Sequence, residues 1–89
     1  MIAKRWSVEV FLSEDDDRTT RARAVLHAET RPGIVGHGDA RRNPDDRDVA
    51  EIGDELAAAR ALVDLGHQLL IVASQDIAAA TGQSAAMLD

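Results

Sequence analysis

The stretch DVAEIGDELAAARALVDLGHQLLIVASQDIAAAT, from Asp48 to Thr81, fills more than a third of the 89-residue chain and contains no proline. Asp48 is a favourable N-cap, Glu51 follows three residues later as in a capping box, and Gly82 stands where helices commonly end. These signals predict one helix, roughly 50 Å long at about 1.5 Å per residue. A strand of about nine residues spans roughly 30 Å, so we expect the helix to overhang its sheet or to bend at Gly66.

Two apolar stripes run along this helix when residues are placed about 100° apart. The first stripe is expected to lie on the core, and the second is too far round the helix for the same sheet to cover. The second stripe therefore predicts a second partner, and the alternative is a single wide face over a generous core. The first stripe is Val49, Ile52, Leu56, Ala59, Val63, Leu70, Ala73 and Ile77, the second is Ala58, Ala61, Leu62, Leu65, Leu69 and Val72, and the polar wedge left over is Arg60, Asp64, Gln68 and Gln75.

The second stripe predicts a homodimer. Its large side chains would otherwise stay exposed together on a small domain, and a twofold axis lets identical stripes cover each other. Pairing of strand edges is a possible addition to the contact. The expected interface is Ala58, Leu62, Leu65, Leu69 and Val72.

Three runs of alternating apolar and polar residues precede the helix, at about 4–13, 19–29 and 33–42. The acidic run at 14–17 and the Pro32-Gly33 pair read as the two hairpin connections. We therefore expect one α+β domain over 1–89, with a three-stranded antiparallel sheet in order 1-2-3 and the long helix across one face.

The strand faces that point at the helix carry small residues. Glycine inside a strand weakens it unless something must come close, so Gly36 and Gly38 predict a helix that sits low on the sheet. A phosphate-binding loop is the alternative for these glycines, but more strand follows them instead of a helix. The inward faces are expected to be Thr20, Ala22, Ala24, Leu26 and Ala28 on the second strand and Ile34, Gly36, Gly38 and Ala40 on the third.

Composition bounds the class of protein. The net charge is −6, with eight basic against seven acidic residues up to Asn43 and two against nine after it. The helix half is acidic, which argues against nucleic-acid binding through net charge alone. There is no cysteine, no apolar leader and no apolar segment of about 18 residues without charges, so a cytoplasmic protein outside the membrane is expected.

The residues suggest no enzyme and no cofactor. His27, His37 and Asp39 could form a two-histidine, one-carboxylate metal set on paper, but they read better as solvated residues of an open sheet face. The serines lie in no nucleophile motif. We expect neither a metal nor a small-molecule substrate.

The outer sheet face mixes arginines with aromatic and aliphatic side chains. Such a surface could contact RNA phosphates and stack a base on Phe11. Glu9 and Asp39 dilute its charge, and an ordinary solvated sheet face is the alternative. The candidate RNA-binding residues are Arg5, Arg21, Arg23 and Arg41.

A further set of residues, which includes glycines of the third strand and residues of the helix, carries a resemblance: Trp6, Gly36, Gly38, Ala40, Arg41, Asn43, Pro44, Ile52, Gly53, Glu55, Leu56, Arg60, Leu62 and Leu69. At these positions the chain resembles a family of short actinobacterial domains of unknown function, from Lys4 to about Ala80, with the helix as the most specific part. The resemblance implies a fold like the double-stranded-RNA-binding domain without its first helix, similar in shape to ribosome hibernation promoting factors. It implies dimerisation and a link to hypoxic or dormancy stress, and no catalytic residues.

The residues predict a non-enzymatic protein whose arginine face could contact the ribosome or its RNA, and the resemblance implies an accessory role in stress or dormancy. The alternative is a homodimeric protein-interaction module without an RNA role. The expected partners are a second copy of the chain and ribosomal RNA. Salt-sensitive RNA affinity separates the two hypotheses.

Overall fold

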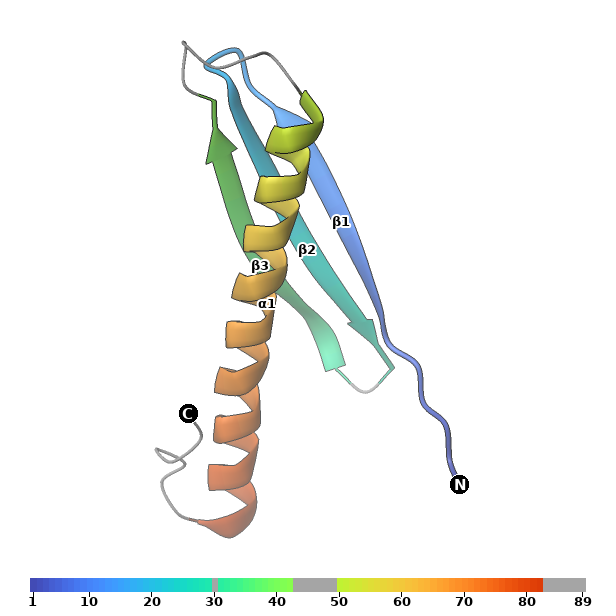
Figure 1. The fold of residues 1–89 in the computed structure, drawn as a ribbon. Coiled ribbons are helices and arrows are strands. Elements are labelled where there is room, and N and C mark those ends of the chain that lie inside the picture. Colours follow the sequence, from blue (N-terminus) through green and yellow to red (C-terminus); the bar gives the residue numbers. More distant parts are fainter. Residues whose placement is uncertain (30, 43–49, 83–89) are drawn as a thin grey trace.

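The structure is a computed structural model that describes residues 1–29, 31–42 and 50–82. Three strands, β1 (Ser7–Glu14), β2 (Thr19–Ala28) and β3 (Arg31–Arg41), precede one helix, α1 (Ala50–Thr81). The strands form an antiparallel sheet in order β1-β2-β3, and α1 crosses one face of it (Figure 1). The predicted α+β fold and strand order are confirmed.

The ends of the elements follow local chemistry, with one correction. Gly82 has φ +69 and its N–H donates to the carbonyl of Ala78 at 2.8 Å, which is the predicted glycine helix end. The prediction that Pro32-Gly33 forms a hairpin turn is wrong, because Arg31 already pairs with Ala28 and β3 continues through both residues. Proline has no N–H to donate, and an edge strand such as β3 tolerates it where that position does not donate to the ladder. The predicted cap at Asp48 lies outside the described residues.

The sheet meets α1 through small residues, as predicted. Cβ atoms added at Gly36 would overlap the backbone of Ala61 and Leu65, and one at Gly38 would overlap the backbone of Ala57 and Ala61. Only glycine leaves room for a helix this close. The buried apolar core is therefore thin, and among the described residues no large side chain is fully buried. Its members are Ala22, Ala24, Leu26, Ala40, Ala57, Ala61 and Leu65, with Val10, Ile34 and Leu69 packed against them.

The helix turns a different face to the sheet than the sequence predicts. The buried face follows Ala57, Ala61 and Leu65, whereas the stripe assigned to the core, from Ile52 onward, lies on the far side and is exposed, with Val63 at 61%. The physical reason is the close approach at the strand glycines, because large side chains cannot fit where helix backbone contacts sheet backbone. The apolar stripe on the far side is hereafter the back stripe, and its large side chains are Ile52, Leu56, Val63, Leu70 and Ile77.

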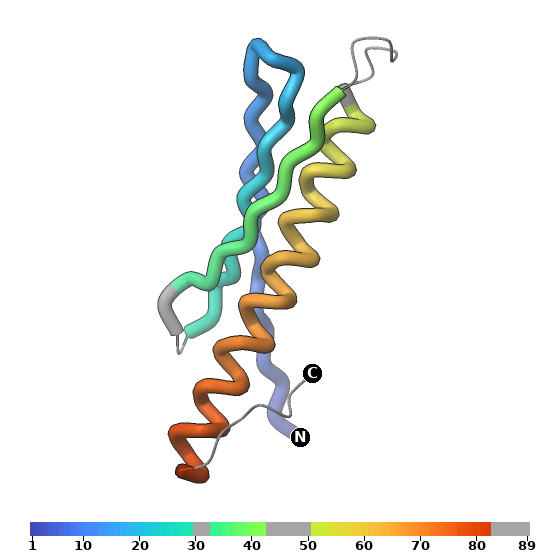
Figure 2. The backbone as a smooth tube through the Cα atoms, turned by 90° about the vertical axis from the view of Figure 1, so that its left-hand side faces the viewer, coloured from blue at the N-terminus to red at the C-terminus, as the bar shows by residue number. Residues whose placement is uncertain are grey.

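The helix covers β2 and β3 and leaves β1 largely uncovered, as Figures 1 and 2 show from two sides. Its C-terminal third extends past the ends of the strands, which confirms the predicted overhang. Gly53, near the start of α1, lies against Thr20, which pairs with Glu14 at the end of β1. Leu65 lies against Gly36, at the level of Val10, so α1 runs antiparallel to β1.

Candidate interaction surfaces

The helix fastens itself to β3 with two polar side chains. The Asp64 carboxylate accepts a hydrogen bond from the backbone N–H of His37 at 2.8 Å, and the Arg60 guanidinium donates to the carbonyl of Asp39 at 2.8 Å. The hydrogen bond from the His37 backbone is the main cause that holds the pKa of Asp64 below its usual value, and a smaller contribution comes from a hydrogen bond with the Gln68 side chain. These contacts satisfy backbone groups of a strand that would otherwise be an open edge. The sequence pattern placed both residues in the polar wedge of the helix without predicting these contacts, although their four-residue spacing puts them on one side of the helix.

β1 is the opposite edge of the sheet, and its helix-side face is apolar and exposed. Val8, Val10 and Leu12 pair with Leu26, Ala24 and Ala22, so they share the face that α1 packs on. Because α1 lies over the other two strands, Val8 stays 43% and Leu12 46% exposed. Trp6, just before the strand, is exposed as well. Trp6, Val8 and Leu12 are hereafter the β1 patch.

The flank of α1 nearest β1 carries most of the predicted dimer residues. Arg60 and Asp64 occupy the flank over β3, so residues about 180° round from them face β1. Leu62 is exposed there, and Ala58, Leu69 and Val72 are half-buried. Leu65 is 4% exposed in the single chain and packs on the sheet, so it leaves the predicted interface. The dimer itself stays a prediction.

The outer sheet face carries the predicted arginines in separate environments. Arg23 pairs with Phe11 on one side and His37 on the other, and its guanidinium lies 4.9 Å from the centre of the Phe11 ring. Arg21 donates to the Asp15 carboxylate at 2.7 Å, and this hydrogen bond raises the pKa of Arg21. Arg41 is exposed at the end of β3.

The acidic hairpin tip is used for local structure. Asp15 holds Arg21, and Asp17 accepts a hydrogen bond from the Thr19 N–H at 3.2 Å. The side-chain hydrogen bond with Thr19 lowers the pKa of Asp17. Both carboxylates therefore have partners within the hairpin, and the face that carries Arg21 is less basic than its sequence indicates.

The histidines do not assemble the metal site considered above. His37 pairs with Arg23, four residues along β2 from His27, which puts the two histidines roughly 13 Å apart along the sheet. The His27 Nε2 lies 3.2 Å from a carboxylate oxygen of Glu9 instead. Within residues 1–29, 31–42 and 50–82 no group of three histidine or acidic side chains is placed to hold a metal ion.

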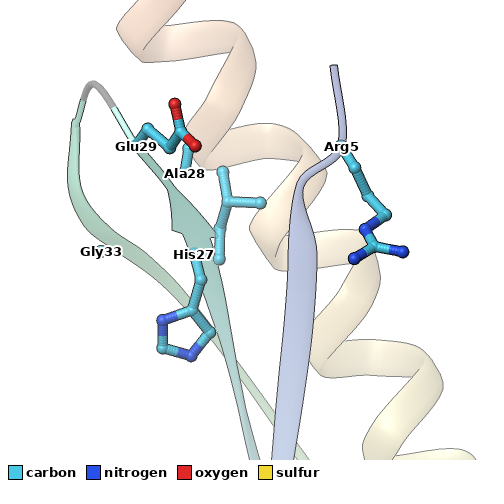
Figure 3. Close-up of a pocket in the computed structure, with 6 residues that line it drawn as sticks. Arg5, His27, Ala28, Glu29 and Gly33 are labelled. Atoms are coloured by element: carbon cyan, nitrogen blue, oxygen red, sulfur yellow. The ribbon is translucent and has the colours of Figure 1, made fainter. Parts of the chain in front are cut away.

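Arg5 and His27 border a shallow hollow at the other end of the sheet. Its volume is about 270 Å³, and Glu29 and Gly33 contribute to its rim. Figure 3 shows the Arg5 side chain beside the segment before β1, on the other side of that strand from His27 and Glu29. The opposite charges at the rim select neither an anion nor a cation.

The hydropathy of α1 also bears on membranes. The segment Glu51–Thr81 is long and apolar enough to cross a bilayer, with a mean hydropathy of 1.4 over its most apolar 18 residues. One face of it, through Ala57 and Ala61, is packed on the sheet. The same test is passed by helices that pack on the core of a protein, and the contact of α1 with the sheet is of that kind.

These features define a class: a small α+β protein whose helix packs closely on strand glycines. One edge strand of its sheet is hydrogen-bonded to the helix, the other edge strand is open, and the exposed face of the helix is apolar. The family model described as Rv2632c-like matches residues 4–86. The chain belongs to this Rv2632c-like family, which confirms its resemblance to short actinobacterial proteins of unknown function.

Relatives and a solved structure support that membership. The chain is 46% identical over 87 residues to the uncharacterized protein Mb1767 of Mycobacterium bovis, covering 98% of this chain and 90% of the relative. It is 49% identical over 82 residues to the uncharacterized protein Rv2632c of Mycobacterium tuberculosis, covering 92% and 86%. The crystal structure of Rv2632c superposes with a TM-score of 0.81 at 47% identity, covering 93% of this chain and 96% of that one. None of these names describes an enzymatic activity.

Proposed function

We propose that the protein is a non-enzymatic, homodimeric protein-interaction module. The observation that carries this proposal is the exposed back stripe, on a domain whose buried apolar core, in the described part of the chain, consists of five alanines and two leucines. Burying a large apolar side chain contributes roughly 1.5–3 kcal/mol, and small domains commonly gain such burial by associating. A second copy offers the same apolar surface, which satisfies a twofold interface.

The direct test is the molecular mass in solution. Light scattering at micromolar concentration should give twice the chain mass of 9.6 kDa. Leu56→Glu should reduce the mass to that of one chain, because it places a charge in the back stripe. Ala79→Glu is the matched control, since it introduces the same charge at an exposed position of the overhang. A monomer mass for the unmodified protein at all concentrations would overturn the proposal.

RNA contact through the outer sheet face is a second candidate, and Arg23 stacked on the exposed Phe11 favours it. We rank it lower because Arg21 is already paired with Asp15. Co-sedimentation with ribosomes at low and high salt tests it, with Arg23→Ala and Arg41→Ala expected to weaken a salt-sensitive association. Absence from the ribosomal fraction at both salt concentrations would remove this candidate. Leu56→Glu serves as the control for loss of the dimer without loss of arginines.

The stress or dormancy role, the likeness to ribosome hibernation promoting factors and the cytoplasmic location remain predictions. The first two rest on the resemblance, and the third rests on the composition of the chain. A test of the first is the abundance of the protein in hypoxic against aerated cells of its source organism.

A further inference from the structure

The back stripe and the β1 patch are two apolar surfaces on the helix side of the molecule that the single chain leaves uncovered. α1 occupies the space above β2 and β3, and the space above β1 beside it is open (Figure 1). We propose that in the homodimer α1 of each protomer lies over β1 of its partner, so that the back stripe covers the partner's β1 patch and each helix is held between two sheets. This inference rests on the proposed function and specifies its geometry.

The spacings of the two surfaces agree. Ile52, Leu56 and Val63 span about 16 Å along the helix at about 1.5 Å per residue. Trp6, Val8 and Leu12 span about 20 Å along the strand at about 3.3 Å per residue. The three helix side chains can therefore meet the three strand side chains in order, Ile52 at Trp6, Leu56 at Val8 and Val63 at Leu12.

Charge selects the direction in which the partner helix runs. The start of α1 carries the exposed acids Glu51 and Glu55, and the exposed bases Lys4 and Arg5 precede β1. The far end of β1 leads into the acidic tip at 14–17. Opposite charges meet, and like charges stay apart, only if the partner's α1 runs parallel to β1.

That direction is the one a twofold axis requires. Within one chain α1 is antiparallel to β1. A partner helix that runs parallel to this β1 is therefore antiparallel to this chain's α1. Two equivalent helices related by a twofold axis perpendicular to them must be antiparallel. Leu12 lies at the level of Ala57 and Ala61, and Val8 lies near the level of Leu69. The proposed contacts place Val63 of the partner at the level of Leu12 and Leu56 of the partner at the level of Val8. The twofold axis then passes near Leu62.

Small residues on the flank of α1 that faces β1 fit this arrangement. Nothing lies within 4 Å of where a Gly66 Cβ would be, so no contact within the described chain explains a glycine in the helix interior. Ala58 and Ala59 lie on the same side of the helix. Two helices with glycine and alanine at their contact can approach closely, and Leu62 of each would meet its own copy.

Cysteine cross-linking tests the arrangement without background, because the chain has no cysteine. A mixture of Leu12→Cys protein and Val63→Cys protein, oxidised with copper phenanthroline, should give a disulfide-linked pair of different chains. Leu62→Cys alone should link to itself. Arg23→Cys mixed with Val63→Cys is the control and should give no product, since Arg23 lies on the outer sheet face.

Other outcomes overturn the inference and leave the proposed function separable from it. A dimer mass with self-linked Val63→Cys and no Leu12–Val63 product would mean that the back stripes face each other. A dimer mass with self-linked Val10→Cys and no Leu12–Val63 product would mean that the β1 edges pair. A monomer mass would overturn the proposed function as well.

A second measurement does not depend on disulfide geometry. Val8→Asp should abolish the dimer as Leu56→Glu does, because both side chains lie in the same reciprocal contact. Circular dichroism equal to that of the parent protein shows that each variant is folded. A folded Val8→Asp protein that keeps the full dimer mass would contradict the placement of α1 over the partner's β1.

Discussion

The Asp64 carboxylate accepts a hydrogen bond from the backbone N–H of His37 at 2.8 Å, one helical turn from Arg60, which donates to the carbonyl of Asp39. The helix thereby supplies hydrogen-bond partners to backbone groups of β3 that a further strand would otherwise bind. The β1 edge of the sheet has no such cover from the helix. We predict that Asp64→Asn lowers the midpoint of urea denaturation, because a charged acceptor binds a backbone N–H more strongly than an amide does. Asp16→Asn, the same change at an exposed position of the hairpin tip, is the control and should leave the midpoint unchanged.

Acid should weaken the same contact. The pKa of Asp64 in the folded chain is lowered from its ordinary value of 3.8, mainly by the hydrogen bond from His37. A lowered pKa contributes stability that is complete above the unfolded-state pKa and is lost as the pH falls through the folded-state value. Urea midpoints measured from pH 7 to pH 2.5 should decrease once the pH is below about 4. The decrease should be smaller in Asp64→Asn. Equal slopes in the two proteins would show that another group dominates.

The strand glycines should be intolerant of even one methyl group. Gly38→Ala would drive a Cβ into the backbone of Ala57 and Ala61, which neither rotation nor a flexible side chain can relieve. We expect a loss of about 1–3 kcal/mol or more in the free energy of unfolding. Gly33→Ala on the same strand is the control, because its Cβ would meet only ordinary van der Waals contacts. Chemical denaturation of both variants checks the difference.

Leu65 and Leu62 should differ in kind. Leu65 is buried on the sheet, so Leu65→Ala should cost about 2–5 kcal/mol at every protein concentration. Leu62 is exposed in the single chain, so Leu62→Ala should act by weakening association, and its effect should grow on dilution. Thermal melts at several protein concentrations separate the two. If the effect of Leu65→Ala depended on protein concentration and that of Leu62→Ala did not, Leu65 would belong to the dimer interface.

Local patterns in the sequence were sufficient for the elements of this fold. The alternation of strand residues predicted which side chains of β2 face the helix, since side chains of a strand point to opposite faces in turn. The glycines of β3 predicted a close contact with the helix, and Gly82 predicted its end. Each of these inferences depends on neighbours in sequence or on a single strict steric requirement.

Which face of α1 meets the sheet was decided only by the tertiary structure. The larger apolar side chains, such as Leu56 and Val63, indicated one face, but the glycines of β3 bring the backbones so close that only the Ala57 and Ala61 face fits. Periodicity measures how apolar a helix face is, whereas packing depends on how its volume fits the opposing surface. The same close approach brings Asp64 to the edge of β3. Because α1 packs on β2 and β3, it leaves β1 and the back stripe uncovered.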